Sequence, residues 1–158
     1  MDTKKDKLGF IGAGNMATAL IKGLIQSGLY DKDHLIASDS EKMALEKISG
    51  QFGVRPYASN AELARKSSTL IFSVKPQSIR EVLEDIKDEI RDDHLVISIA
   101  AGIPLKIIHS IIGRNIPMIR VMPNTPALIQ KGMSALAAGK FTTSGHMKIA
   151  IGIFEAVG

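Results

Sequence analysis

Short apolar runs rich in β-branched residues alternate along the chain with longer segments whose apolar residues recur at helical spacing. The short runs predict buried strands, and the longer segments predict helices. We expect strands over residues 7–11, 35–38, 54–57, 69–74, 94–99, 116–121 and 134–138, and helices over 15–27, 41–49, 61–66, 76–90 and 104–112, with a last helix running toward the C-terminus.

Several predicted helices begin with residues that are typical of a first turn. Asn60 is expected to cap the helix over 61–66, and Thr142 or Thr143 the last helix, because their side chains can accept from backbone N–H groups. Pro76 and Pro104 open theirs, where no N–H is needed. Strands alternating with helices predict an α/β fold of the Rossmann type: a doubly wound, mostly parallel sheet with helices on both faces.

The composition narrows the class of protein. The 158 residues fit one domain, and the absence of cysteine excludes a thiol nucleophile, a disulfide framework and a thiolate metal site. Residues 1–7 are charged and lack the apolar core of a secretory signal. Since no apolar run approaches the roughly 18 residues of a membrane span, we expect a cytoplasmic protein without a membrane partner.

The charge gives no clear sign of an anionic polymer as partner. The formal net charge is +4, but the basic residues are scattered along the chain in no block longer than a pair. Aromatic residues make up only 4% of the chain, too few to suggest a platform on which bases stack. We therefore expect no nucleic-acid partner.

A glycine-rich segment follows the first predicted strand and opens the first predicted helix, from Gly12 to Ala17. Gly12 permits a tight turn, Gly14 lets the backbone approach a pyrophosphate, and Ala17 lets the helix pack closely on the strand. The helix N-terminus then offers N–H groups and a positive dipole end to phosphates. The alternative is a purely structural turn, but the strand–turn–helix context favours a dinucleotide site.

Asp39 follows the second predicted strand, 22 residues after Ala17. An acid near this spacing accepts from the ribose 2′-hydroxyl and repels a 2′-phosphate, which favours NAD. Ser38, Ser40 and Lys42 surround it and could hold a phosphate, which would suit NADP. Asp39 could instead cap the helix that starts at Glu41, so the choice between NADP and NAD stays open.

Four segments resemble the pyrroline-5-carboxylate reductases in order and spacing. They are FIGAGNMA over residues 10–17, SVKP over 73–76, SIAAGI over 98–103 and RVMPNTPA over 120–127. The first is shared with many β-hydroxyacid dehydrogenases, whereas the Met-Pro-Asn-Thr-Pro segment is far more specific. The resemblance implies reduction of 1-pyrroline-5-carboxylate to L-proline with NADPH or NADH, the last step of proline biosynthesis.

The resemblance also implies a set of site residues, and each of the four segments follows a predicted strand, where open α/β sheets bind ligands. Asn124 and Thr125 are expected where nicotinamide meets substrate. The expected cofactor-binding residues are Ile11, Gly12, Ala13, Gly14, Asn15, Met16, Ser38, Asp39, Ser40, Asn60, Ser73, Val74, Lys75, Pro76, Ile99, Ala100 and Ala101.

Some of these residues have plainer interpretations. Lys75 could be a solvated turn residue, and Asn124 could bond only its own loop. Gly23, inside the first helix, is interpreted as a packing position. The histidines at 34, 94, 109 and 146 are expected to be ordinary surface or edge residues, without metal spacing or a nearby partner. No catalytic residue and no metal site is predicted.

The resemblance covers the NAD(P)-binding domain, which we assign to residues 1–158. Members of the family continue into a helical domain that carries the dimer interface and most groups that grip the substrate carboxylate, and this sequence ends before it. We therefore expect the chain to supply the cofactor-binding half of a homo-oligomeric enzyme, and by itself to be weakly active or inactive. The alternatives are another dehydrogenase of the β-hydroxyacid type and a non-catalytic nucleotide-sensing module.

Overall fold

The computed structural model describes residues 6–158. One seven-stranded sheet has the order β3-β2-β1-β4-β5-β6-β7. All neighbouring strands pair in parallel except β6 and β7, which are antiparallel. The strands are β1 (Leu8–Ile11), β2 (Leu35–Ser38), β3 (Arg55–Tyr57), β4 (Thr69–Phe72), β5 (Leu95–Ser98), β6 (Met118–Met122) and β7 (Ala135–Ala138).

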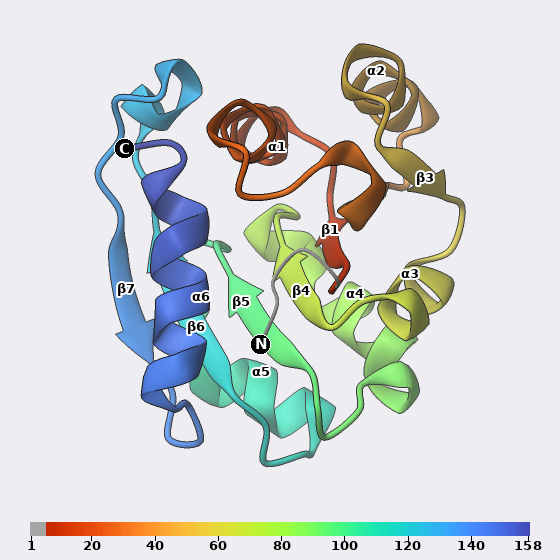
Figure 1. Ribbon diagram of the computed structural model, residues 1–158. Helices are drawn as coiled ribbons and strands as arrows, with labels where there is room; N and C mark the ends of the chain where they lie inside the picture. Colours follow the sequence, from red (N-terminus) through yellow and green to blue (C-terminus); the bar gives the residue numbers. More distant parts are fainter. Residues whose placement is uncertain (1–5) are drawn as a thin grey trace.

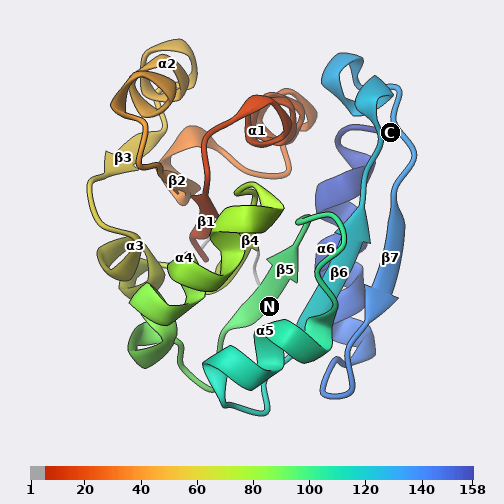
Figure 2. The same cartoon turned by 180° about the vertical axis from the view of Figure 1, so that it is seen from behind.

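Six α-helices cover the two faces of this sheet, as the sequence predicts. Figure 1 shows α6 in front of the sheet and α5 behind it, and Figure 2 shows the reverse side. The helices are α1 (Asn15–Ser27), α2 (Lys42–Phe52), α3 (Asn60–Lys66), α4 (Ile79–Ile86), α5 (Leu105–Ile112) and α6 (Ser144–Glu155). The predicted Rossmann-type fold is therefore confirmed.

Two apolar clusters hold the layers together. One joins the sheet to α1, α2 and α6, and the other joins it to α3, α4 and α5. Successive residues of β4 alternate between them: Ile71 packs into the first cluster, and Leu70 and Phe72 into the second. Because both faces are covered, β1, β4 and β5 are buried along their whole length, and their polar residues, Thr69 and Ser98, lie at strand ends.

The segment predicted as one helix over 76–90 is divided into three pieces. A 3₁₀ turn (η2, Pro76–Ser78) precedes α4, and a second (η3, Lys87–Glu89) follows it. Short 3₁₀ turns at helix ends use the backbone groups that lack α-helical partners. Two further 3₁₀ turns, η1 (Lys32–His34) and η4 (Thr125–Ile129), were not predicted.

Close backbone contacts fix the end of α6 against the rest of the domain. A Cβ atom built on Gly23 of α1 would lie 2.3 Å from the carbonyl oxygen of Ala156. The interpretation of Gly23 as a packing position is therefore confirmed. On the other side, the N–H of Gly132 donates to the carbonyl of Val157 at 2.8 Å.

Candidate functional site

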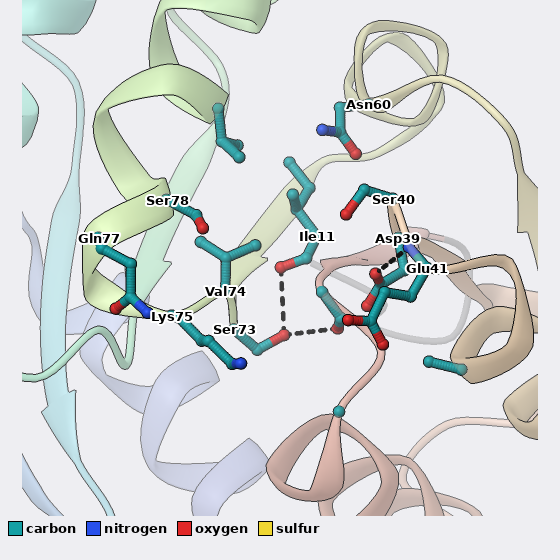
Figure 3. A pocket seen from close by; sticks show the side chains of 14 residues that line it. Ile11, Asp39, Ser40, Glu41, Asn60, Ser73, Val74, Lys75, Gln77 and Ser78 are labelled. Atoms are coloured by element: carbon teal, nitrogen blue, oxygen red, sulfur yellow. Dashed lines mark hydrogen bonds between the residues drawn. The ribbon is translucent and has the colours of Figure 1, made fainter.

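A cavity of about 450 Å³ opens at the carboxyl ends of β1, β2 and β4 (Figure 3). The sequence order of the strands reverses between β1 and β4, which makes this the topological switch point of the sheet. Ligands of open α/β sheets bind at such points. The lining residues are Ile11, Gly12, Gly14, Asp39, Ser40, Glu41, Ala44, Asn60, Ser73, Val74, Lys75, Gln77, Ser78 and Val82.

Glycine is suited to positions 12 and 14 of the loop for different structural reasons. Gly12 has φ of +106°, and a Cβ there would lie 2.6 Å from the carbonyl oxygen of Ser73. An L side chain is therefore excluded at Gly12 by conformation and by contact. Gly14 has φ of −81°, and a Cβ there would meet no atom within 4 Å. The free space beside Gly14 belongs to the cavity, so a ligand can approach its backbone.

Helix α1 begins directly after Gly14, the residue of the loop that lines the cavity next to the helix. Gly14 provides no side-chain cap, and the first turn holds no acidic residue. The first intrahelical bond is that of Thr18 N to Gly14 O at 2.9 Å. The N–H groups of Asn15, Met16 and Ala17 precede it and have no partner inside the helix. These donors and the helix dipole suit a phosphate group.

Ser73 joins the ends of β1 and β4. Its N–H donates to the carbonyl of Ile11 at 2.9 Å, and its Oγ donates to the carbonyl of Gly12 at 2.7 Å. Figure 3 shows this hydroxyl between the two backbone oxygens. β4 therefore ends at Phe72, two residues before its predicted end, because Ser73 turns toward the glycine loop.

Asp39 bonds two backbone segments. Its Oδ2 accepts from the N–H of Ala13 at 2.7 Å, and its Oδ1 accepts from the N–H of Glu41 at 2.7 Å. Helix α2 begins at Lys42, with Glu41 in the N-cap position and no side-chain cap. The helix predicted to start at Glu41 therefore starts one residue later, and Asp39 closes the turn before it instead of capping it.

Asn60 lines the cavity but is not a helix cap. The capping residue of α3 is Ser59, whose Oγ accepts from the N–H of Glu62 at 3.2 Å. Asn60 is the first residue of the helix, and its Oδ1 accepts from Ser38 Oγ at 2.6 Å. The predicted capping role of Asn60 is therefore wrong, because the preceding serine takes it. Its Nδ2 keeps donors for other partners.

The other predicted site residues lie at the same edge of the sheet but outside the cavity lining. Ala13, Asn15 and Met16 lie in or next to the glycine loop, Ser38 ends β2 and Pro76 opens η2. Ile99, Ala100 and Ala101 follow β5. Asn124 and Thr125 follow β6, and Asn124 Oδ1 accepts from the N–H of Met133 at 2.9 Å.

Five lining residues were not predicted: Glu41, Ala44, Gln77, Ser78 and Val82. Glu41 and Ala44 come from the start of α2. The other three come from η2 and α4. A signal was present in the sequence, since each lies within six residues after a predicted strand-end segment. Which face of that turn meets the cavity depends on tertiary packing.

The expectation of four ordinary surface or edge histidines is wrong for His94, which is fully buried. Its Nε2 lies 2.9 Å from the carbonyl oxygen of Ser67, and its Nδ1 accepts from the N–H of Arg91 at 2.8 Å. Burial lowers the pKa of His94. This histidine begins the connection into β5, at the edge of the sheet opposite the cavity.

The other histidines have partners that the sequence did not reveal. His34 Nδ1 lies 2.6 Å from Asp31, and the hydrogen bond between them lowers the pKa of Asp31. His146 completes a capping box with Thr143, which confirms Thr143 as the cap of α6. His109 Nε2 lies 3.0 Å from Asn115 Oδ1.

Two broader features follow from residues 6–158. This part of the chain holds no group of three or more His, Cys, Asp or Glu side chains that could share a metal ion. Within the same residues, no helix has the length and apolarity to cross a membrane.

The strand order, the glycine loop and the cavity at the switch point define an α/β domain of the Rossmann type. The chain belongs to the family described as NADP oxidoreductase, coenzyme F420-dependent, whose model matches residues 7–102. Its relatives include pyrroline-5-carboxylate reductases, so the resemblance stated from the four segments is confirmed.

One such relative is the pyrroline-5-carboxylate reductase of Methanosarcina acetivorans, which is 40% identical over 155 residues. The match covers 98% of this chain and 57% of that protein. A solved structure from Coxiella burnetii, a pyrroline-5-carboxylate reductase, has a TM-score of 0.93 at 31% identity and covers 97% of this chain and 57% of its own.

A Plasmodium falciparum pyrroline carboxylate reductase was solved with NADP bound. It has a TM-score of 0.87 at 29% identity, over 99% of this chain and 56% of that one. This chain therefore spans a little over half the length of each of these relatives.

Proposed function

We propose that this chain is the NAD(P)H-binding part of an enzyme that reduces 1-pyrroline-5-carboxylate to L-proline. The observation that carries the proposal is the cavity at the switch point, which the glycine loop, β2 and β4 enclose. The relatives of the chain include proteins named pyrroline-5-carboxylate reductase. The cofactor, when bound, supplies a hydride to the imine carbon of the substrate. The residues of the chain bind and orient it.

The donors at the start of α1 suit the pyrophosphate. The open space beside Gly14 lets the phosphates approach the backbone. At the other end of the cavity, Ser40 and the Nδ2 of Asn60 are suited to bind oxygen atoms on the adenosine ribose. We propose NADP as the cofactor, as in the Plasmodium falciparum structure, with NAD as the alternative.

The loops after β5 and β6 are proposed to line the nicotinamide and substrate side. Ala101 and Asn124 are exposed at the carboxyl edge of the sheet. Exposed apolar side chains lie near Asn124, among them Met122 and Met133, with 56% and 78% exposure. We propose that the further length found in the relatives covers this region and completes the substrate site, in a homo-oligomeric enzyme. The predicted cytoplasmic location stays a prediction.

Calorimetric titration of the 158-residue chain with NADPH and with NADH tests the binding part. We expect saturable binding of at least one cofactor. Steady-state reduction of pyrroline-5-carboxylate, measured on the chain and on a protein that spans the full length of the relatives, tests the activity. We expect turnover by the long protein and little or none by the chain.

The outcomes separate the alternatives. A long protein that oxidises 3-hydroxy acids with NAD+ or NADP+ and does not reduce the imine would indicate a β-hydroxyacid dehydrogenase. Cofactor binding with no response to proline or to the imine in the long protein would indicate a nucleotide-sensing module. Absence of binding to either cofactor would contradict the proposal itself.

A further inference from the structure

Asp39 connects two walls of the cavity through its carboxylate. Oδ2 accepts from the N–H of Ala13 in the glycine loop, and Oδ1 accepts from the N–H of Glu41 in the β2–α2 turn, each at 2.7 Å. Both distances are at the short end for such bonds, as expected when the acceptor is charged. The two peptide groups come from parts of the chain that are 28 residues apart, and no other side chain in residues 6–158 joins them.

The N–H of Ala13 depends on this partner. Ala13 has only 4% exposure, so its backbone donor is largely shielded from water. It also follows Gly12, whose φ of +106° orients the peptide group between them. Loss of the carboxylate would leave a shielded donor without a partner in a loop that already adopts a conformation few residues tolerate.

The geometry points to Asp39 as a positioning residue, which holds the glycine loop in the shape that receives the dinucleotide. An acid at this place is commonly read as the acceptor of the ribose 2′-hydroxyl. Here its shortest contacts are to two backbone donors of the chain itself. The N–H groups of Asn15 and Met16 stay available for phosphate, because the carboxylate binds Ala13 and not the first turn of α1.

The two roles predict different results for cofactor binding, and this part of the inference rests on the proposed function. An acid that reads the ribose discriminates between the cofactors, so its removal changes the ratio of the NADPH and NADH affinities. A residue that positions the loop acts on the pyrophosphate site, which both cofactors share. Its removal weakens both by a similar factor.

The experiment compares Asp39→Asn with Glu41→Gln in the 158-residue chain. Asn at 39 keeps the shape but directs an amide donor at one of the two backbone donors. Glu41 lines the same cavity and is exposed, so its replacement removes an equal charge without this pair of bonds. For Asp39→Asn we expect the calorimetric Kd values for NADH and NADPH both to rise about tenfold or more. The free energy of a hydrogen bond to a charged group corresponds to about this factor in Kd. For Glu41→Gln we expect mainly a change in the ratio.

Amide hydrogen exchange gives a readout that does not need a ligand. We expect the Ala13 amide to exchange at least about tenfold faster in Asp39→Asn than in the parent chain, while amides of the β4–β5 pairing keep their protection. Asp39→Ser, which cannot span both donors, should repeat the result if the first variant folds poorly. A circular dichroism melt of each variant separates this local effect from global unfolding.

Two results would overturn the inference: NADPH binding that tightens while NADH binding weakens in Asp39→Asn, or unchanged exchange at Ala13. If the parent chain binds neither cofactor, the proposed function fails. The exchange measurement still decides whether Asp39 holds the loop.

Discussion

At the carboxyl ends of β1, β2 and β4, backbone and side chains converge on one cavity, whereas the ends of β5 and β6 lead into loops that contribute none of its lining. In the first region, Ser73 and Asp39 bond directly to the glycine loop. In the second, Asn124 bonds its own loop through Met133. The cofactor side is therefore built within this sheet, and the proposed substrate side is not enclosed by the residues described.

This difference shows what a local motif can determine. The glycine loop is placed by the strand that precedes it and the helix that follows it, so the motif carries its own geometry. The Met-Pro-Asn-Thr-Pro segment does not line this cavity. The η4 turn packs against α1, but Asn124 and Thr125 stay exposed. A motif can be specific enough to indicate a protein family although its residues do not form a binding site by themselves.

The largest expected effect comes from breaking the first region at Gly12. We expect Gly12→Ala to lower the free energy of unfolding by about 2–4 kcal/mol, because of the positive φ and the contact with Ser73. Dinucleotide binding should be lost with it. Chemical denaturation, followed by circular dichroism, measures the first quantity and calorimetry the second.

Gly14→Ala is the matched control for that change. Its Cβ would meet no protein atom within 4 Å, so the stability should change by less than about 1 kcal/mol. Cofactor binding should still weaken about tenfold or more, because the methyl group enters the space proposed for the pyrophosphate. Unchanged affinity in Gly14→Ala would contradict the placement of the phosphates beside this glycine.

The next largest effect is expected where α1, the helix that follows the glycine loop, packs against the end of α6. We expect Gly23→Ala to cost about 1–3 kcal/mol of stability, because the new Cβ would lie 2.3 Å from the Ala156 carbonyl oxygen. Gly50→Ala, inside α2 and with no atom near its Cβ, should instead stabilise by about 0.5–1 kcal/mol. Equal effects of the two substitutions in urea denaturation would argue against this packing.

The smallest effect is expected from the pH dependence of stability through His94. Burial lowers its folded-state pKa, so below the unfolded value near 6.5 the unfolded chain binds more protons than the folded chain. Stability should therefore be complete above about pH 6.5 and fall as the pH decreases, by at most about 1.4 kcal/mol per pH unit. Urea denaturation at several pH values should show this slope.

His94→Gln removes the titrating group and serves as the control for that slope. The variant should be less stable at pH 8, where the buried hydrogen bonds of the parent histidine are intact. Its stability should change less between pH 7 and pH 5. A slope equal to that of the parent chain would assign the pH dependence to other groups.

Much of the fold could be predicted from the sequence because most strands are short apolar runs, and all seven predicted strands are present. Strand ends were the weakest part: β4 is shorter than predicted because Ser73 leaves the sheet to bond Gly12. The division of the 76–90 segment was also missed, since the same residues suit α and 3₁₀ turns. Where a strand ends, and whether a turn is α or 3₁₀, depends on tertiary contacts that a single sequence does not show.

The candidate site was predicted unevenly for a similar reason. Predicted site residues that follow a strand directly, such as Gly12 and Ser73, do line the cavity. Asp39 was identified, but its bond to Ala13 links residues far apart in the sequence and could not be foreseen. His94 carries no local signal of burial either. Sequence reasoning missed contacts that form between elements, such as the bond from Ala13 to Asp39 and the packing of His94 beside Ser67.

The position of the cavity lining along the chain has a consequence for synthesis on the ribosome. Every lining residue lies between Ile11 and Val82, ahead of β5, β6 and β7. At roughly 5–20 residues per second, the remaining part of the chain takes on the order of 4–15 s to be made. The residues that form the proposed nucleotide site are therefore all synthesised before the second half of the sheet.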